Sequence, residues 1–354
     1  MSDQIPKTMR AVVQKQDEKW VEVKEVPVPT LEKNEVLVEI EYAAQNPTDW
    51  KHATGISPPG VQNGCDFAGT VVSLGSELDV PLKVGDKVAG CTHGGIYKDR
   101  GAYAEYARID SDMCFKVPEG MKLEEASTFG VAWVTACQAL IDSQKKQFPT
   151  QDKVPKGTWY VIYGASSSVG LFAVLLAKAM GYKIIGVASP HSFDLVKSYG
   201  ADEVLDYHDG DKAIADALKL TDGEGVEYAL DTISEGDSWR ITLGMMGKKG
   251  KQLNGILPVT DEAKKLNPKI EIVFTVMYTL FGKEFKFGPN TVPASEHDHE
   301  FGKAIFANTA ELITKHGIKA NPVSIRGGLD DVSDGFKEMQ AGKVSGKKLV
   351  YKIA

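Results

Sequence analysis

The sequence predicts an α/β protein of two domains, in which a β-rich domain is interrupted by a domain with a doubly wound parallel sheet. The length of 354 residues suits two domains of ordinary size. The first third consists of short strand-like segments separated by turn residues. From about residue 125 onward, apolar strands alternate with helical segments, which is typical of a parallel sheet covered on both faces.

Alternating or β-branched segments predict the strands of the first domain. They cover residues 9–14, 20–26, 35–44, 68–75, 85–91 and 101–109. Glycines interrupt these segments at short intervals. Short strands at such spacing favour a partly open barrel.

A long apolar segment over 124–142 predicts a helix that leads into the second domain. Strands are expected at 158–164, 183–189, 203–207, 226–233 and 250–257, with helices at 168–181, 193–200, 213–220 and 239–247 between them. The apolar residues 269–282 fit either an additional strand or a contact surface. A helix over 301–317 and a mixed tail follow, and we expect the tail to return to the first domain. We therefore place the domains at 1–130, 131–293 and 294–354.

Composition narrows the classes of function. A 42% apolar and 25% charged chain with a net charge of −7 has no basic region for nucleic acid. No apolar run approaches the roughly 18 residues of a membrane span, and the start lacks a secretory signal. Cys65, Cys91, Cys114 and Cys137 are scattered and form no CxxC pair, which indicates reduced thiols. We expect a cytoplasmic protein.

The stretch VIYGASSSVG, residues 161–170, has the form of a strand and turn that bind a dinucleotide. Gly164 ends the strand and Gly170 lies where the next helix meets it, but the two usual glycines between them are serines. Small serines tolerate such a turn, and the helix N-terminus still presents N–H groups to a phosphate. An ordinary serine-capped turn is the alternative.

No acidic residue follows the next predicted strand, which ends at Ala188. An acid there binds the ribose 2′-hydroxyl of NAD, and it would repel the 2′-phosphate of NADP. Ser189, His191 and Ser192 can donate hydrogen bonds instead, so the pattern favours NADPH. Ser189 before Pro190 also fits a simple helix cap.

Several motifs together resemble the medium-chain dehydrogenase/reductase superfamily over nearly the whole chain. They are NPTDWK (46–51), GCDFAGTV (64–71), VGDKVAG (84–90), GAYAEY (101–106), the turn at 164–170 and SGKKLV (345–350). YGAS, SPHSFDL, GADEVLDY and SGKKLV resemble most closely the zinc-free fungal branch of trans-acting enoyl reductases and related quinone or aldehyde reductases. The resemblance implies a GroES-like barrel domain that carries the catalytic site and a Rossmann domain.

The resemblance argues against zinc. Zinc alcohol dehydrogenases have a cysteine where this chain has Asn46, and a His-Glu pair where it has Cys65 and Asp66. They also carry a four-cysteine structural site that this chain lacks. Catalytic zinc needs about three protein ligands, and scattered residues such as His52, His93 and Cys91 are more often structural. We expect no metal.

Carrying the family's contacts over residue by residue implies a set of site residues. The cofactor contacts are Thr48, Asp49, Lys51, Thr135, Gly164, Ser166, Ser167, Ser168, Val169, Ser189, His191, Ser192, Tyr207, Ser345, Gly346 and Lys347. The substrate contacts are Trp133, Met277 and Phe281, and the catalytic candidates are Lys51 and Tyr278. Alternatives remain: Thr48 and Asp49 fit a turn after Pro47, Lys347 and Lys348 fit solvated charges, and the substrate contacts fit core packing.

The resemblance implies reduction of an activated C=C bond by NADPH without zinc. Lys51 is a candidate to neutralise developing negative charge, Tyr278 is a candidate proton donor, and solvent is the alternative donor. A quinone or aldehyde reductase and a non-catalytic NADPH-binding protein are the rival functions. A polyketide synthase or its acyl carrier is the implied partner, and the chain is expected to be a monomer or a homodimer.

Overall fold

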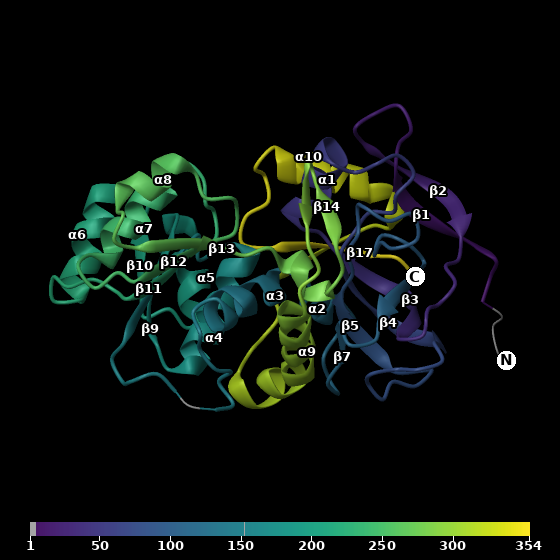
Figure 1. Ribbon diagram of the computed structural model, residues 1–354, viewed down its shortest axis with the longest axis horizontal. Coiled ribbons are helices and arrows are strands. Elements are labelled where there is room, and N and C mark those ends of the chain that lie inside the picture. The colour runs from purple at the N-terminus through teal and green to yellow at the C-terminus, as the bar shows by residue number, and fades with distance from the viewer. Residues whose placement is uncertain (1–4, 152) are drawn as a thin grey trace. The chain divides into compact units, whose positions relative to one another are not determined.

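Residues 5–151 and 153–354 are described by a computed structural model of the chain (Figure 1). They divide into two units. The first holds residues up to Val131 together with Tyr278–Ala310 and Ala320–Ala354, and the second holds Ala132–Met277 and Glu311–Lys319. No helix of the described residues is long and apolar enough to cross a membrane.

The first unit is built on a seven-stranded sheet in the order β16-β17-β3-β4-β5-β7, with β6 also paired to β3. Its strands are β3 (Glu35–Ala44), β4 (Asp66–Leu74), β5 (Lys87–Cys91), β6 (Tyr106–Asp110), β7 (Cys114–Lys116), β16 (Val323–Arg326) and β17 (Lys348–Lys352). Separate hairpins are formed by β1 (Thr8–Gln14) with β2 (Val21–Pro27) and by β14 (Phe285–Phe287) with β15 (Asn290–Val292). The helices are α1 (Pro47–Gly55), α2 (Leu123–Ala126), α9 (Glu296–His316), which continues into the second unit, and α10 (Val332–Gln340).

Strand β3 explains how this sheet curls into the predicted open barrel. Its first half pairs with β6, its second half pairs with β17, and β4 pairs along nearly all of it. The register between β3 and β4 shifts at Leu37/Val38 and again at Ile40/Tyr42. Such irregularities bend a strand and increase its twist. Near the C-terminus, β17 pairs with β3, so residues 320–354 lie in the first unit.

The second unit contains a six-stranded parallel sheet in the order β10-β9-β8-β11-β12-β13. The strands are β8 (Trp159–Tyr163), β9 (Lys183–Ala188), β10 (Glu203–Asp206), β11 (Tyr228–Asp231), β12 (Gln252–Gly255) and β13 (Glu271–Phe274). The helices are α3 (Val131–Cys137), α4 (Ser168–Met180), α5 (Phe193–Ser198), α6 (Gly210–Leu220), α7 (Ser238–Met246) and α8 (Asp261–Leu266). Numbered from β8, the order is 3-2-1-4-5-6, which is that of a Rossmann fold.

The helix predicted over 124–142 is broken, so that expectation is corrected. Helix α2 ends at Ala126, α3 begins at Val131, and residues 138–142 form a π-helical turn. A Cβ at Gly130 would lie 2.1 Å from Oδ1 of Asp66, so the chain approaches that carboxylate too closely for any larger residue. The break at residues 127–130 therefore follows from a contact distant in sequence.

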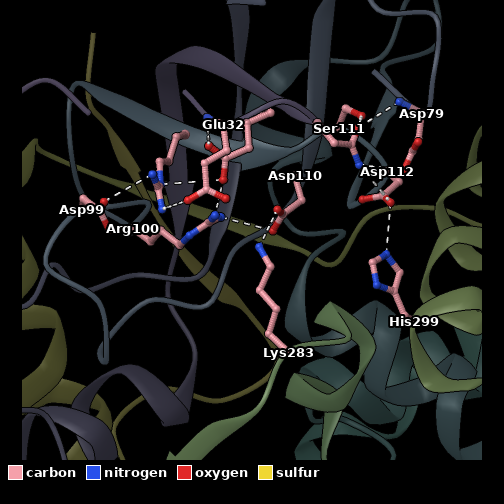
Figure 2. Close-up of polar contacts among 12 residues, drawn as sticks. Glu32, Asp79, Asp99, Arg100, Asp110, Ser111, Asp112, Lys283 and His299 are labelled. Carbon is pink, nitrogen blue, oxygen red and sulfur yellow. Dashed lines mark hydrogen bonds and ion pairs between the residues drawn. The ribbon is translucent and has the colours of Figure 1, made fainter. Parts of the chain in front are cut away.

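Residues 278–293, which the sequence assigned to the second domain, lie in the first unit. Polar contacts hold this segment to the β6–β7 region (Figure 2). Lys283 of this segment donates to Asp110 at 2.8 Å, and in helix α9, which follows the segment, Nε2 of His299 lies 3.1 Å from Asp112. Ring packing adds to these contacts, since Phe285 lies 5.0 Å from the ring of His93. These pairings join segments that are far apart in the chain, which is why the sequence alone did not place the boundary here.

Candidate active site

The turn between β8 and α4 keeps glycine at the two positions where its geometry requires it. Gly164 has a φ of +70°, and a Cβ there would lie 2.4 Å from Oγ1 of Thr232. A Cβ at Gly170 would lie 2.3 Å from the carbonyl oxygen of Gly164, so the helix packs directly on the turn. The serines between them occupy positions without these restrictions.

The serines of this turn have different surroundings. Oγ of Ser167 accepts from the backbone N–H of Gly170 at 2.9 Å and lies 2.9 Å from Oγ1 of Thr232. Ser167 is therefore the N-cap of α4, and its hydroxyl serves the turn. Ser166, Ser168 and Val169 are half-buried, so they keep surface at the helix N-terminus.

The residues that follow β9 form a second polar group. Oγ of Ser189 donates to the hydroxyl of Tyr207 at 3.0 Å, and His191 is exposed. Ser192 is buried, with 3% of its surface exposed, so its hydroxyl offers little to a ligand. Asp206, at the end of β10, is paired with His208, whose Nδ1 lies 2.5 Å from Oδ1 of the carboxylate.

In the first unit, Asp49 stabilises the start of helix α1. Its Oδ2 accepts from the backbone N–H of Asn46 at 2.7 Å and from the hydroxyl of Tyr103 at 2.8 Å. Burial is the main reason why the pKa of Asp49 is raised to about 7. The contacts of this carboxylate fit the alternative role at the turn after Pro47, because its hydrogen bonds go to the protein.

Tyr278 and Thr48 form a hydroxyl pair in the first unit. Their side-chain oxygens are 2.6 Å apart, and Sγ of Cys65 lies 3.9 Å from the tyrosine hydroxyl. The tyrosine ring stacks on His93 with centroids 4.0 Å apart. Burial raises the pKa of Tyr278 well above its ordinary value, so the phenol stays protonated and has a proton to donate. Lys51 is exposed on the same helix as Thr48.

The remaining predicted residues fall into two groups. Trp133 is fully buried against Phe172, with ring centroids 5.5 Å apart, which favours core packing over substrate contact. Thr135 and Met277 are buried in the second unit, and Phe281 is buried in the first. The last group, Ser345–Lys347, forms the loop before β17, in which Ser345 and Lys347 are exposed and Gly346 has a φ of +62°.

Lys348 was interpreted as compatible with a solvated charge, and that interpretation is wrong. Its side chain is 1% exposed, its Nζ donates to Oδ1 of Asn46, and Nζ lies 3.1 Å from Oδ2 of Asp66. The sequence alone could not predict this pairing. Lys347 and Lys348 are adjacent, and the apolar residues that follow do not show which of the two side chains is buried.

Comparisons with known proteins agree with this architecture. Residues 32–119 match the family model of the alcohol dehydrogenase GroES-like domain, and residues 168–284 match that of the zinc-binding dehydrogenases. Trans-enoyl reductase ACTTS2 of Alternaria alternata is 37% identical over 98% of this chain and 99% of its own length. Trans-enoyl reductase resD of Aspergillus sclerotiorum is 32% identical over 98% and 100%. The chain belongs to the trans-enoyl reductase branch of the medium-chain dehydrogenases and reductases.

Solved structures show the same fold for this reductase. The CurK enoyl reductase matches with a TM-score of 0.79 at 19% identity, covering 99% of this chain and 100% of that chain. A quinone oxidoreductase from Coxiella burnetii matches with a TM-score of 0.71 at 23% identity, covering 98% and 100%. At these identities the likeness concerns architecture alone.

Membership implies a nicotinamide cofactor, and the second unit of the reductase fits one. The turn 164–170 follows β8, where the strand order reverses between β8 and β11. Rossmann proteins bind dinucleotides at this place. Gly164 and Gly170 allow the N-terminus of α4 to pack closely on the turn. The first N–H groups of a helix lack partners within the helix, so they can bind a phosphate.

Zinc does not fit the corresponding residues of the first unit. Oδ1 of Asn46 already accepts a hydrogen bond from Lys348, so it is not free to bind a metal. Asp66 already has an ammonium group as its partner. Within the described residues, no three His, Cys, Asp or Glu ligands converge around this position.

The raised pKa of Asp49 predicts a pH-dependent stability. Between pH 4 and 7 the folded state holds a proton on Asp49 that the unfolded state, with a pKa near 3.8, releases. Relative to an ionised Asp49, the protonated form stabilises the folded state. This stabilisation is complete below pH 4 and is lost as the pH rises through 7. Relative to Asp49→Asn, wild type should lose up to about 4 kcal/mol of unfolding free energy across that range.

Denaturant unfolding at a series of pH values measures this difference. Asp17→Asn, which alters an exposed aspartate of the same unit, should follow wild type. A constant difference between wild type and Asp49→Asn from pH 4 to 8 would show that Asp49 is ionised throughout.

Proposed function

We propose that this reductase uses NADPH to reduce a carbon–carbon double bond conjugated to a carbonyl group. The observation that carries the proposal is the Thr48–Tyr278 hydroxyl pair, 2.6 Å apart, in a site whose residues do not fit zinc. The relatives named trans-enoyl reductases support the substrate class.

The chemistry asks the protein for a proton and for stabilisation of negative charge. NADPH, when bound, supplies the hydride that reaches the carbon β to the carbonyl. Thr48 donates its hydroxyl proton to the α-carbon and takes the proton of Tyr278, and the tyrosinate then regains a proton from solvent. The exposed Lys51, on the same helix as Thr48, supplies positive charge for the enolate oxygen.

Buried aromatic rings pack around Tyr278. In the first unit the ring of His93 lies 5.7 Å from that of Phe281 and 5.0 Å from that of Phe285. Burial lowers the pKa of His93 well below its ordinary value, so this ring stays neutral. These rings are buried, so they surround the hydroxyl pair with apolar packing. The unsaturated acyl chain and an acyl carrier or synthase as its source stay predictions.

Selectivity for NADPH rests on the residues that follow β9. Ser189, Pro190 and His191 provide hydroxyl and imidazole groups at this strand end, with no carboxylate among them. The hydrogen bond between Ser189 and Tyr207 holds both side chains in place. These groups support recognition of a 2′-phosphate.

Replacing Ser189 by Asp tests this assignment. A carboxylate beside the 2′-phosphate should weaken NADPH binding about 30-fold or more, and NADH binding by less than about threefold. Titrations that follow nicotinamide fluorescence measure both dissociation constants. Ser198→Asp adds the same charge at the exposed end of α5 and should leave the NADPH-to-NADH ratio unchanged. Equal losses for both cofactors with Ser189→Asp would refute the assignment.

Tyr278→Phe tests the proton donor. Removing one hydroxyl should lower kcat for an α,β-unsaturated thioester by about 100-fold, with NADPH affinity within about threefold of wild type. Steady-state kinetics and the same titration provide these values. Tyr97→Phe is the matched control, because that ring also packs on His93, at 5.7 Å.

Other outcomes select other functions. An unchanged kcat for Tyr278→Phe would mean that solvent supplies the proton. Turnover of quinones or aldehydes without enone reduction would favour the rival reductases, and NADPH binding without any turnover would favour a non-catalytic protein.

A further inference from the structure

Lys348 lies at the start of β17, directly after the loop Ser345–Lys347. It is the only lysine among the described residues that is buried. Its ammonium group donates to Oδ1 of Asn46 and lies 3.1 Å from Oδ2 of Asp66. Burying an ammonium group costs solvation free energy, because the charge leaves water. The partners of Lys348 therefore indicate what the buried charge does.

Each partner of Lys348 fixes a different segment. Asn46 is the N-cap of α1, and its backbone N–H is held by Asp49 at 2.7 Å. Asp66 begins β4, and its Oδ1 accepts from the backbone N–H of Val131 at 2.7 Å. One ammonium group thus connects β17, β4 and the first turn of α1, which carries Thr48.

Charge balance gives the ammonium group a specific role. Asp49 and Asp66 are both buried, and the negative charge of Asp66 helps to raise the pKa of Asp49. Lys348 provides positive charge beside them, and its attraction opposes the effect of burial on the pKa of Asp66. A divalent cation would have to displace this ammonium group or bind against its repulsion.

We infer that Lys348 is a positioning residue: its ammonium group replaces the metal at positions where zinc dehydrogenases bind zinc, and it holds Asn46 so that Thr48 meets Tyr278. The inference rests on the proposed function for its catalytic consequence. Its structural consequence, an internal cation that excludes a metal, is independent of the substrate.

The experiment compares three variants of the full chain. Lys348→Met removes the charge and keeps the aliphatic chain, but it leaves Asp66 buried without a partner. The double variant Lys348→Met/Asp66→Asn removes both charges and keeps an oxygen for the N–H of Val131. Lys352→Met is the matched control, because Lys352 lies on the same strand and is exposed.

Thermal unfolding, NADPH titration and kinetics with an α,β-unsaturated thioester are the measurements. Lys348→Met should unfold at a clearly lower temperature, and the double variant should regain most of that loss. The double variant should still show a kcat at least about tenfold below wild type, with an NADPH dissociation constant within about threefold, because Asn46 remains unanchored. Lys352→Met should match wild type in every measurement.

Recovery of both stability and kcat in the double variant would overturn the inference, since Lys348 would then only neutralise Asp66. After incubation with Zn²⁺ and dialysis, wild type should retain far less than one equivalent of zinc, and stoichiometric retention would also overturn it. If wild type reduces no thioester, the proposed function fails, while the unfolding and zinc measurements still decide whether Lys348 is the internal cation.

Discussion

The buried ion pair between Lys348 and Asp66 is the interaction on which the arrangement of the first unit depends. Both side chains are almost completely buried, and they come from strands at opposite ends of the chain. Breaking one member of such a pair typically costs about 3–5 kcal/mol, because the other charge is left in a medium that solvates it poorly. The hydrogen bond from Lys348 to Asn46 extends this constraint to helix α1, and Thr48 on that helix meets Tyr278. The contacts of Lys348 with Asp66 and Asn46 therefore both compensate a buried charge and fix the helix that carries Thr48.

The second unit satisfies a different constraint, the close approach of a helix to a strand. Only Gly164 and Gly170 lie where a side chain would collide with Thr232 or with the turn itself. The serines between them do not weaken the turn, because Ser167 caps helix α4. A glycine-poor fingerprint is thus compatible with an ordinary Rossmann turn. Serine in place of glycine restricts the backbone of the turn, but the helix N-terminus that attracts a phosphate is kept.

The sequence predicted features that follow from local patterns. The strand–helix alternation after residue 158 gave a parallel sheet, and the segment 269–282 does supply an extra strand, β13. The sequence did not predict features that depend on contacts between distant residues. The helix breaks at Gly130 because the chain there lies against Asp66, and Lys348 is buried because it pairs with Asn46 and Asp66. For the site, motif resemblance gave Thr48 and Tyr278 separately, and only the structure shows that their hydroxyls meet.

Deuterium tracing tests the central claim most directly, namely hydride transfer to the β-carbon of an activated double bond. An α,β-unsaturated thioester would be reduced with NADPH that carries deuterium at C4 of the nicotinamide, in samples prepared with each of the two C4 stereoisomers, and the product would be examined by NMR. The account predicts one deuterium at the β-carbon from one of the two stereoisomers and a proton from the protein or solvent at the α-carbon. Deuterium on the carbonyl carbon, or no reduction of the double bond with either stereoisomer, would contradict it.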